Sequence, residues 1–262
     1  MSLPTEEDLK RYDPIKADIT VVLETPHEQD TESKRVFEEK VRHVASFRKH
    51  LEGMEDYSTI ARDDYCGVLS ALDYLCFCGE IFRPAPIYSN MLPLTFKIIS
   101  DPDSTTMART WIEGSRYVLG INVAKHDTPL MLIGTLLHEM SHMLIHKLRR
   151  QEQIEGRPML EYLFGATGHG YYWQRLARVV EARAYEIIDR RIDVGRLEAI
   201  SHEREASGIV PSQAYYEMCY GGWESSDGKP MAEVASEYVE SCHNVRLNKE
   251  ALQEMAFPNG GE

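Results

Sequence analysis

The chain has 262 residues, 43% of them hydrophobic, which is enough for one or two compact domains with a hydrophobic core. Its formal net charge is −13, and it lacks an uncharged apolar run long enough to cross a bilayer, so we expect no membrane span. The acidic start without an apolar segment predicts no secretory signal. Five irregularly spaced cysteines favour a reducing, intracellular compartment, the nucleus or the cytoplasm.

Charge is distributed unevenly along the chain. Residues 1–60 hold nine basic against fourteen acidic residues, residues 61–197 hold sixteen of each, and residues 198–262 hold four against twelve. We therefore expect an acidic N-terminal extension with one helix (1–60), a central domain (61–197) and an acidic helical C-terminal extension (198–262). Acidic flanks repel phosphate, which disfavours strong non-specific binding of nucleic acid. The C-terminal extension could also inhibit the central domain.

Hydrophobic periodicity predicts the secondary structure in chain order. The pattern allows a short strand at 19–23 and predicts helices at 32–51 and 64–82, strands at 94–100, 109–113 and 117–123, and further helices at 129–149, 171–192, 212–220 and 230–256. Residues 151–168 are expected to form a loop or a short helix. The helix at 129–149 has a clear start, because Thr128 can cap it and Pro129 suits its first position.

The predicted helix at 129–149 carries the motif His138-Glu139-Met140-Ser141-His142, flanked by apolar residues. Residues four apart lie on one face of a helix, so the two imidazoles can bind the same metal ion. Zinc metallopeptidases use this spacing, and the glutamate after the first histidine can reach a water on the metal without being a ligand. Two histidines and a glutamate in a buried helix would be costly without partners, and a metal ion supplies one.

Catalytic zinc takes three protein ligands, so a third must come from elsewhere. His169 is the best candidate, because its flanking glycines permit a close backbone approach to a buried ion. His146 continues the four-residue spacing, but three histidines on a straight helix cannot all reach one ion. Glu161 and Glu181 are weaker alternatives: Glu161 lacks an aspartate four residues later, and Glu181 falls within a helical pattern.

The motif at 138–142, the later Gly168-His169-Gly170 and the aromatic residues after it resemble the SprT-like domain, the protease domain of Spartan-type metalloproteases. The resemblance covers about residues 65–190. It implies a SprT-like zinc metalloprotease domain at 61–197, with His138, His142 and His169 as ligands of one catalytic Zn²⁺ and Glu139 as the catalytic residue. The chain departs from the family in lacking a C-terminal four-cysteine zinc ribbon, and the sequence does not decide whether it binds DNA directly.

We therefore expect an α+β, zincin-like fold: a small, mainly antiparallel sheet packed against the metal helix and surrounded by helices. The predicted function is hydrolysis of peptide bonds in a protein or peptide substrate, by a metal-activated water with Glu139 as general base. The segment 116–123 is the candidate edge strand for binding an extended peptide. The alternative is a non-catalytic, zinc-stabilised protein-binding module.

Overall fold

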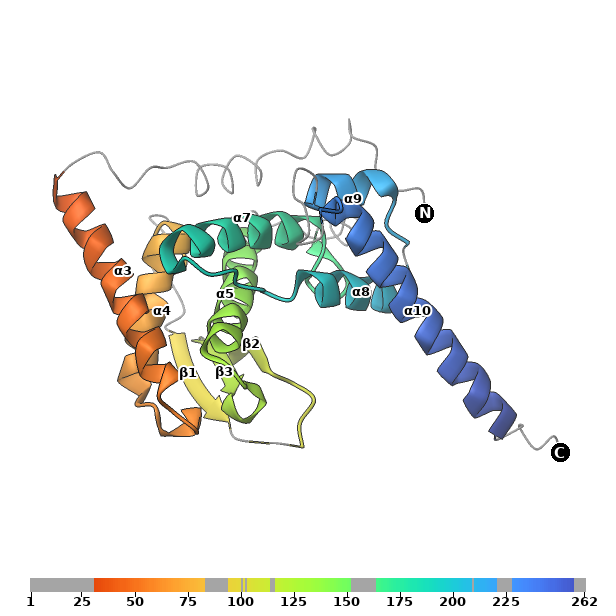
Figure 1. Cartoon of the computed structure of the whole chain (residues 1–262), viewed down its shortest axis with the longest axis horizontal. Helices are drawn as coiled ribbons and strands as arrows, with labels where there is room; N and C mark the ends of the chain where they lie inside the picture. Colours follow the sequence, from red (N-terminus) through yellow and green to blue (C-terminus); the bar gives the residue numbers. More distant parts are fainter. Residues whose placement is uncertain are drawn as a thin grey trace. The chain divides into compact units, whose positions relative to one another are not determined.

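The computed structural model describes residues 31–82, 94–99, 101, 103–113, 116–151, 164–208, 210–220 and 228–256. The possible strand at 19–23 and Glu161 lie outside these residues. Those described form seven α-helices and a three-stranded sheet, which confirms the α+β class (Figure 1). None of the helices among them is both long and apolar enough to span a bilayer.

The elements fall close to the predicted ranges. In order they are α3 (Thr31–Glu52), the 3₁₀ turn η1 (Tyr57–Thr59), α4 (Arg62–Phe77), β1 (Leu94–Ile99), β2 (Ala108–Glu113), β3 (Arg116–Asn122), η2 (Val123–Lys125), α5 (Pro129–Gln151), α7 (Tyr171–Ile188), α8 (Arg196–Ser207), α9 (Gln213–Tyr220) and α10 (Met231–Ala256). Hydrophobic periodicity did not predict α8. Helix α4 ends before the predicted residue 82, because Cys78 and Gly79 adopt positive φ values of 57° and 74° and end the helix.

The chain divides into two compact units, which we describe separately. The first comprises Met1–Glu155 and Val179–Gly195, and the second comprises Gly156–Arg178 and Arg196–Glu262. The described residues from 198 to 256 thus belong to the same compact unit as residues 164–178.

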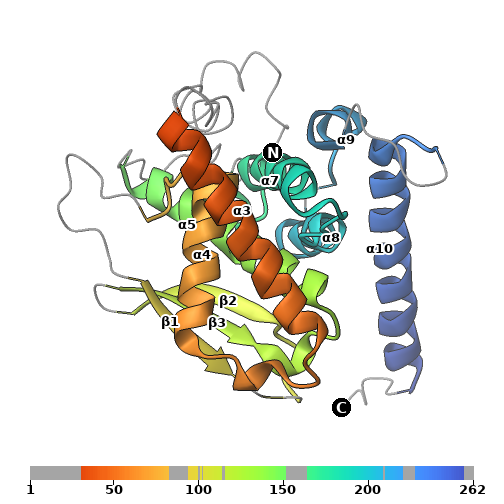
Figure 2. The same ribbon diagram turned by 60° about the vertical axis from the view of Figure 1, so that its left-hand side comes forward.

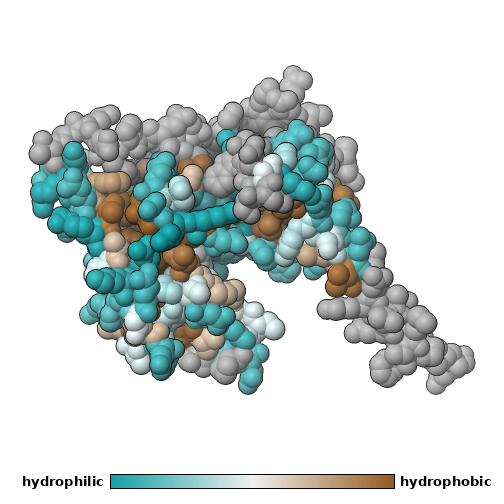
Figure 3. Space-filling view, viewed as in Figure 1, coloured by the Kyte–Doolittle hydropathy of each residue, from teal (hydrophilic) through white to brown (hydrophobic). Residues whose placement is uncertain are grey.

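In the first unit, α3 packs against α4, and both α4 and α5 contact the sheet (Figures 1 and 2). Hydrophilic side chains cover much of the visible surface of α3 (Figure 3). The strand order is β1-β3-β2, with β1 parallel and β2 antiparallel to β3. The sheet is therefore mixed rather than mainly antiparallel.

The register of the strands places Phe96, Leu119 and Thr110 in one row on the face of the sheet that meets the helices. Phe96 contacts Tyr65 of α4, with ring centroids 4.6 Å apart, and Thr110 bonds to Glu139 of α5. On the opposite face, Gly120 leaves room for the indole of Trp111.

The central position of β3 corrects the prediction that segment 116–123 is an edge strand. Residues 117–122 of β3 are buried without interruption, so both faces of this central strand are covered, whereas none of the residues of β2 is buried. The hydrophobic alternation in this segment indicated a strand but not its position in the sheet. Within the described sheet, β1 and β2 form the edges, and β2 lies against α5.

In the second unit, α10 packs against both α8 and α9 (Figure 2). Its core contains Ile200 of α8, several residues of α9 and one face of α10. Arg204 of α8 is largely buried and forms a 3.0 Å ion pair with Glu240 of α10. Glu240 of α10 thus pairs with a buried charge on α8, whose own sequence has little hydrophobic periodicity.

Candidate metal centre

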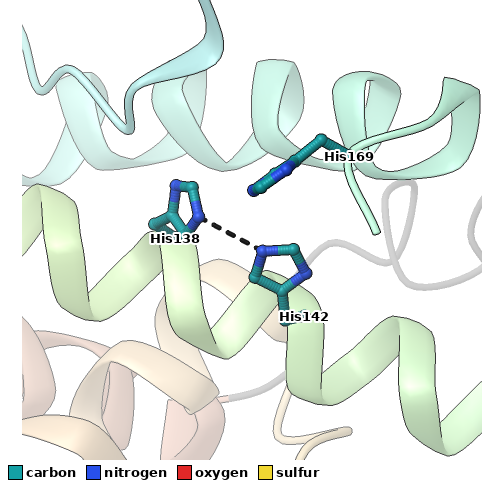
Figure 4. Close-up of side chains that lie close together, drawn as sticks. All are labelled: His138, His142 and His169. Carbon is teal, nitrogen blue, oxygen red and sulfur yellow. Dashed lines mark hydrogen bonds between the residues drawn. The ribbon is translucent and has the colours of Figure 1, made fainter. Parts of the chain in front are cut away.

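Helix α5 brings His138 and His142 together on one face, as the four-residue spacing predicts. Its N-terminus forms as expected: the amide of Met131 donates to Oγ1 of Thr128 over 3.2 Å, just before Pro129 starts the helix. The Nε2 atoms of His138 and His142 lie 3.2 Å apart (Figure 4). Both rings therefore present the same nitrogen to a common point.

The loop after α7 orients His138. Nδ1 of His138 lies 2.8 Å from the carbonyl oxygen of Val194, which accepts its hydrogen bond. The amide of Val194 in turn donates to Oε1 of Glu181 over 3.2 Å, so both the carbonyl and the amide of Val194 are hydrogen-bonded. With its proton on Nδ1, the neutral ring carries its lone pair on Nε2, the atom that faces His142.

Burial also favours the neutral, metal-binding form of His138. It lowers the pKa of the imidazole, and the hydrogen bond to Val194 opposes this shift only in part. Metal ligation requires an unprotonated nitrogen, so a depressed pKa keeps this ligand available near neutral pH.

His169 joins these two residues, as Figure 4 shows. In the described part of the chain, His138, His142 and His169 are the group of metal-ligating side chains with suitable spacing, and their candidate ligand atoms all lie within 4.8 Å of one another. All three are half-buried. The predicted triad is therefore brought together and could bind a metal ion.

The donor set fits a small transition-metal ion. Three nitrogens about 2.0–2.1 Å from a tetrahedral centre would lie roughly 3.3 Å from one another. The Nε2–Nε2 distance of 3.2 Å between His138 and His142 matches that value. Three imidazoles would also leave a fourth coordination position, which is the arrangement of catalytic rather than structural zinc sites.

Glu139 lies between the two helical histidines in sequence, and its side chain is buried. Its Oε2 accepts a 2.8 Å hydrogen bond from the hydroxyl of Thr110, on β2. Burial raises the pKa of Glu139 to about 7, and the hydrogen bonds from Thr110 oppose this shift. A residue of the sheet thus fixes the position of the carboxylate. Its raised pKa suits a group that accepts and releases a proton near neutral pH.

The other ligand candidates are placed differently. His146 lies one further turn along α5 and is exposed. Glu181 accepts the amide of Val194 and is not part of the histidine group.

Sequence reasoning missed three residues around the triad: Thr110, Val194 and Glu203. Thr110 gave a weak signal, since strand alternation places it on the inner face of β2. Val194 acts through its backbone carbonyl, which its residue type does not reveal. Glu203 lies on the unpredicted helix α8, where its carboxylate accepts hydrogen bonds from the loop that carries His169.

Comparison with models of protein families, with curated proteins and with solved structures found no match to this chain. The class of protein is therefore inferred from the residues and geometry of the site.

Proposed function

We propose that the protein is a zinc-dependent endopeptidase with a SprT-like, zincin-type catalytic domain. One observation carries this proposal: three imidazoles form a group that could bind a metal, and the buried carboxylate of Glu139 beside them is held by Thr110. A site that only binds the metal does not need a carboxylate at this position, because Glu139 is not one of the three proposed ligands.

In this proposal His138, His142 and His169 hold the ion. Zinc, when bound, lowers the pKa of a water molecule and polarises the scissile carbonyl. Glu139 accepts the proton of the attacking water and passes it to the leaving amine. Thr110 keeps the Glu139 carboxylate in position through its 2.8 Å hydrogen bond.

The arrangement of the sheet supports a peptide as substrate. Strand β2 is an edge of the described sheet, and its Thr110 contacts the proposed general base. An extended peptide could pair with β2 through backbone hydrogen bonds, which would bring a peptide bond towards the metal centre. β2 thus replaces segment 116–123 as the proposed substrate-binding edge, and an intracellular protein or peptide is the proposed substrate.

The proposal is tested by incubating the full chain with an unfolded protein, with and without a zinc chelator and with and without added DNA. We expect chelator-sensitive fragments from the parental protein. Glu139→Gln should retain zinc and lose cleavage by at least about 100-fold, the usual contribution of a general base. The exposed Glu186 of α7 offers a matched control, and Glu186→Gln should cleave like the parent.

Two results would overturn the proposal. Parental cleavage by Glu139→Gln would exclude Glu139 as the base. If the zinc-loaded parent yields no chelator-sensitive fragments under any of these conditions, the non-catalytic binding module becomes the better description.

A further inference from the structure

A short glycine-rich loop presents His169. It begins at Phe164, whose carbonyl oxygen accepts the amide of Gly170 over 3.0 Å. Gly165 and Gly168 have φ values of +82° and +87°, which residues other than glycine rarely adopt. The loop is thus closed by its own backbone and turns sharply twice.

The carboxylate of Glu203, on α8, fixes this loop. It accepts hydrogen bonds from the amide of Ala166, from the amide of Thr167 at 2.9 Å and from the hydroxyl of Thr167 at 2.6 Å. The approach is so close that a Cβ on Gly165 would lie 2.4 Å from Oε2 of Glu203. The two oxygens of this carboxylate thus serve as acceptors for all three donors.

The hydroxyl of Thr167 makes a second contact, with Nδ1 of His169 at 2.8 Å. A hydroxyl group has one proton, and here that proton goes to the Glu203 carboxylate, which can only accept. The oxygen of Thr167 must therefore be the acceptor towards His169. Nδ1 of His169 consequently carries the proton, and the lone pair of the neutral ring lies on Nε2.

We infer that Thr167 and Glu203 are positioning residues that set the tautomer and ring orientation of His169 for metal binding through Nε2. This inference rests on the proposed metal centre but adds two residues to it. His138 obtains the same tautomer from the Val194 carbonyl. Partners of this kind typically change metal affinity by about 10–100-fold when they are removed.

The variant Thr167→Val separates this role from that of a loop anchor. Valine has nearly the shape of threonine and leaves the backbone amides of Ala166 and Thr167 bonded to Glu203, but it removes the hydroxyl between Glu203 and His169. Thr167→Ser restores a hydroxyl and serves as the rescue. Glu203→Gln weakens the same path from its other end, because a side-chain amide offers one acceptor oxygen instead of two.

The direct readout is the tautomer of His169 in the full-length, metal-free protein, measured by long-range ¹H–¹⁵N correlation after assignment with His169→Gln. We expect the Nδ1–H form in the parent and in Thr167→Ser, and a shift towards Nε2–H in Thr167→Val. If Thr167 contributed only to the stability of the loop, Thr167→Val would leave the tautomer of His169 unchanged. An Nε2–H parent, or an unchanged tautomer in Thr167→Val, overturns the inference. If Thr167→Val does not fold, the tautomer of His169 in the parent protein still tests the inference.

Zinc affinity, measured by competition with a chromophoric chelator, provides the second readout. Thr167→Val and Glu203→Gln should bind zinc about 10–100-fold more weakly, whereas Thr167→Ser should remain close to the parent. If parent and Thr167→Val bind zinc equally, the inference fails and the metal centre stands. If the parent does not bind zinc at all, the proposed function fails, and the tautomer measurement still tests the hydrogen-bonded path.

Discussion

Nδ1 of His138 donates to the carbonyl oxygen of Val194, a residue 56 positions later in the chain, over 2.8 Å. The histidine motif on α5 therefore depends on a loop that carries no motif of its own. The same loop closely approaches α5 one helical turn before His138, where a Cβ on Gly134 would lie 2.2 Å from the carbonyl oxygen of Asp193. Glycine at 134 and the backbone acceptor at 194 thus act together in seating the loop.

The first prediction concerns this close approach. Gly134→Ala should destabilise the protein, because the new methyl group meets backbone rather than a mobile side chain. Overpacking of this kind costs about 1–3 kcal/mol, whereas the higher helix propensity of alanine relative to glycine offsets about 1 kcal/mol of that cost. The displaced loop should also withdraw the acceptor from His138. We therefore expect lower unfolding free energy in denaturant titrations and weaker zinc binding.

Gly53→Ala is the matched control. A Cβ at Gly53 would have its nearest neighbour, the carbonyl oxygen of His50, at an ordinary distance of 3.7 Å. Its stability and zinc affinity should stay near the parental values. If Gly134→Ala proves as stable as Gly53→Ala and binds zinc equally well, the loop is not seated against α5 in the way described.

Local sequence signals predicted much of the site. The spacing of His138 and His142, the Thr128 cap and the apolar flanks were sufficient to place α5 and its histidine face. The glycines around His169 indicated a loop suited to aim this histidine at a buried ion, and the structure places His169 with the two histidines of α5. These predictions succeeded because the relevant forces act between residues near in sequence.

The remaining features depend on contacts between distant residues. Strand β3 has the alternation of a strand, but its central position follows from pairing with β1 on one side and β2 on the other. Helix α8 has little hydrophobic periodicity, because it buries polar groups such as Arg204, which is paired with Glu240. Glu203 could not be connected with Thr167 before α8 itself was known.

A second prediction concerns pH and the turn after α4. Asp73 is buried, and its two carboxylate oxygens accept the amides of Ile81 and Phe82 at 2.9 and 3.0 Å. Burial raises the pKa of Asp73 to about 6, with a smaller contribution from Glu80, while the two amides and Lys147 act in the opposite direction. The folded protein thus holds this proton more tightly than the unfolded chain, in which an aspartate titrates near pH 4.

The difference between the folded and unfolded pKa of Asp73 determines how the stability of the protein changes with pH. The stability contributed by protonated Asp73 is complete below about pH 4 and is lost as pH rises through about 6. Two pKa units correspond to about 3 kcal/mol, an upper bound for this group. Asp73→Asn removes the titration, so the unfolding free energy of the parent minus that of the variant should fall between pH 4 and 7. A constant difference across this range would contradict the raised pKa.

The last prediction tests the third ligand. His169→Ala leaves two imidazoles on α5, so zinc affinity should fall by orders of magnitude, and the stabilisation of the protein by zinc should fall with it. His146→Ala is the matched control on α5: it removes an exposed histidine outside the metal-binding group, and its zinc content should remain near one ion per chain. Zinc per chain after dialysis, together with the melting temperature with and without chelator, measures both effects. Glu161→Ala should behave like His146→Ala. A fully loaded His169→Ala protein and a zinc-free Glu161→Ala protein would move the third ligand to Glu161 and overturn the SprT-like assignment.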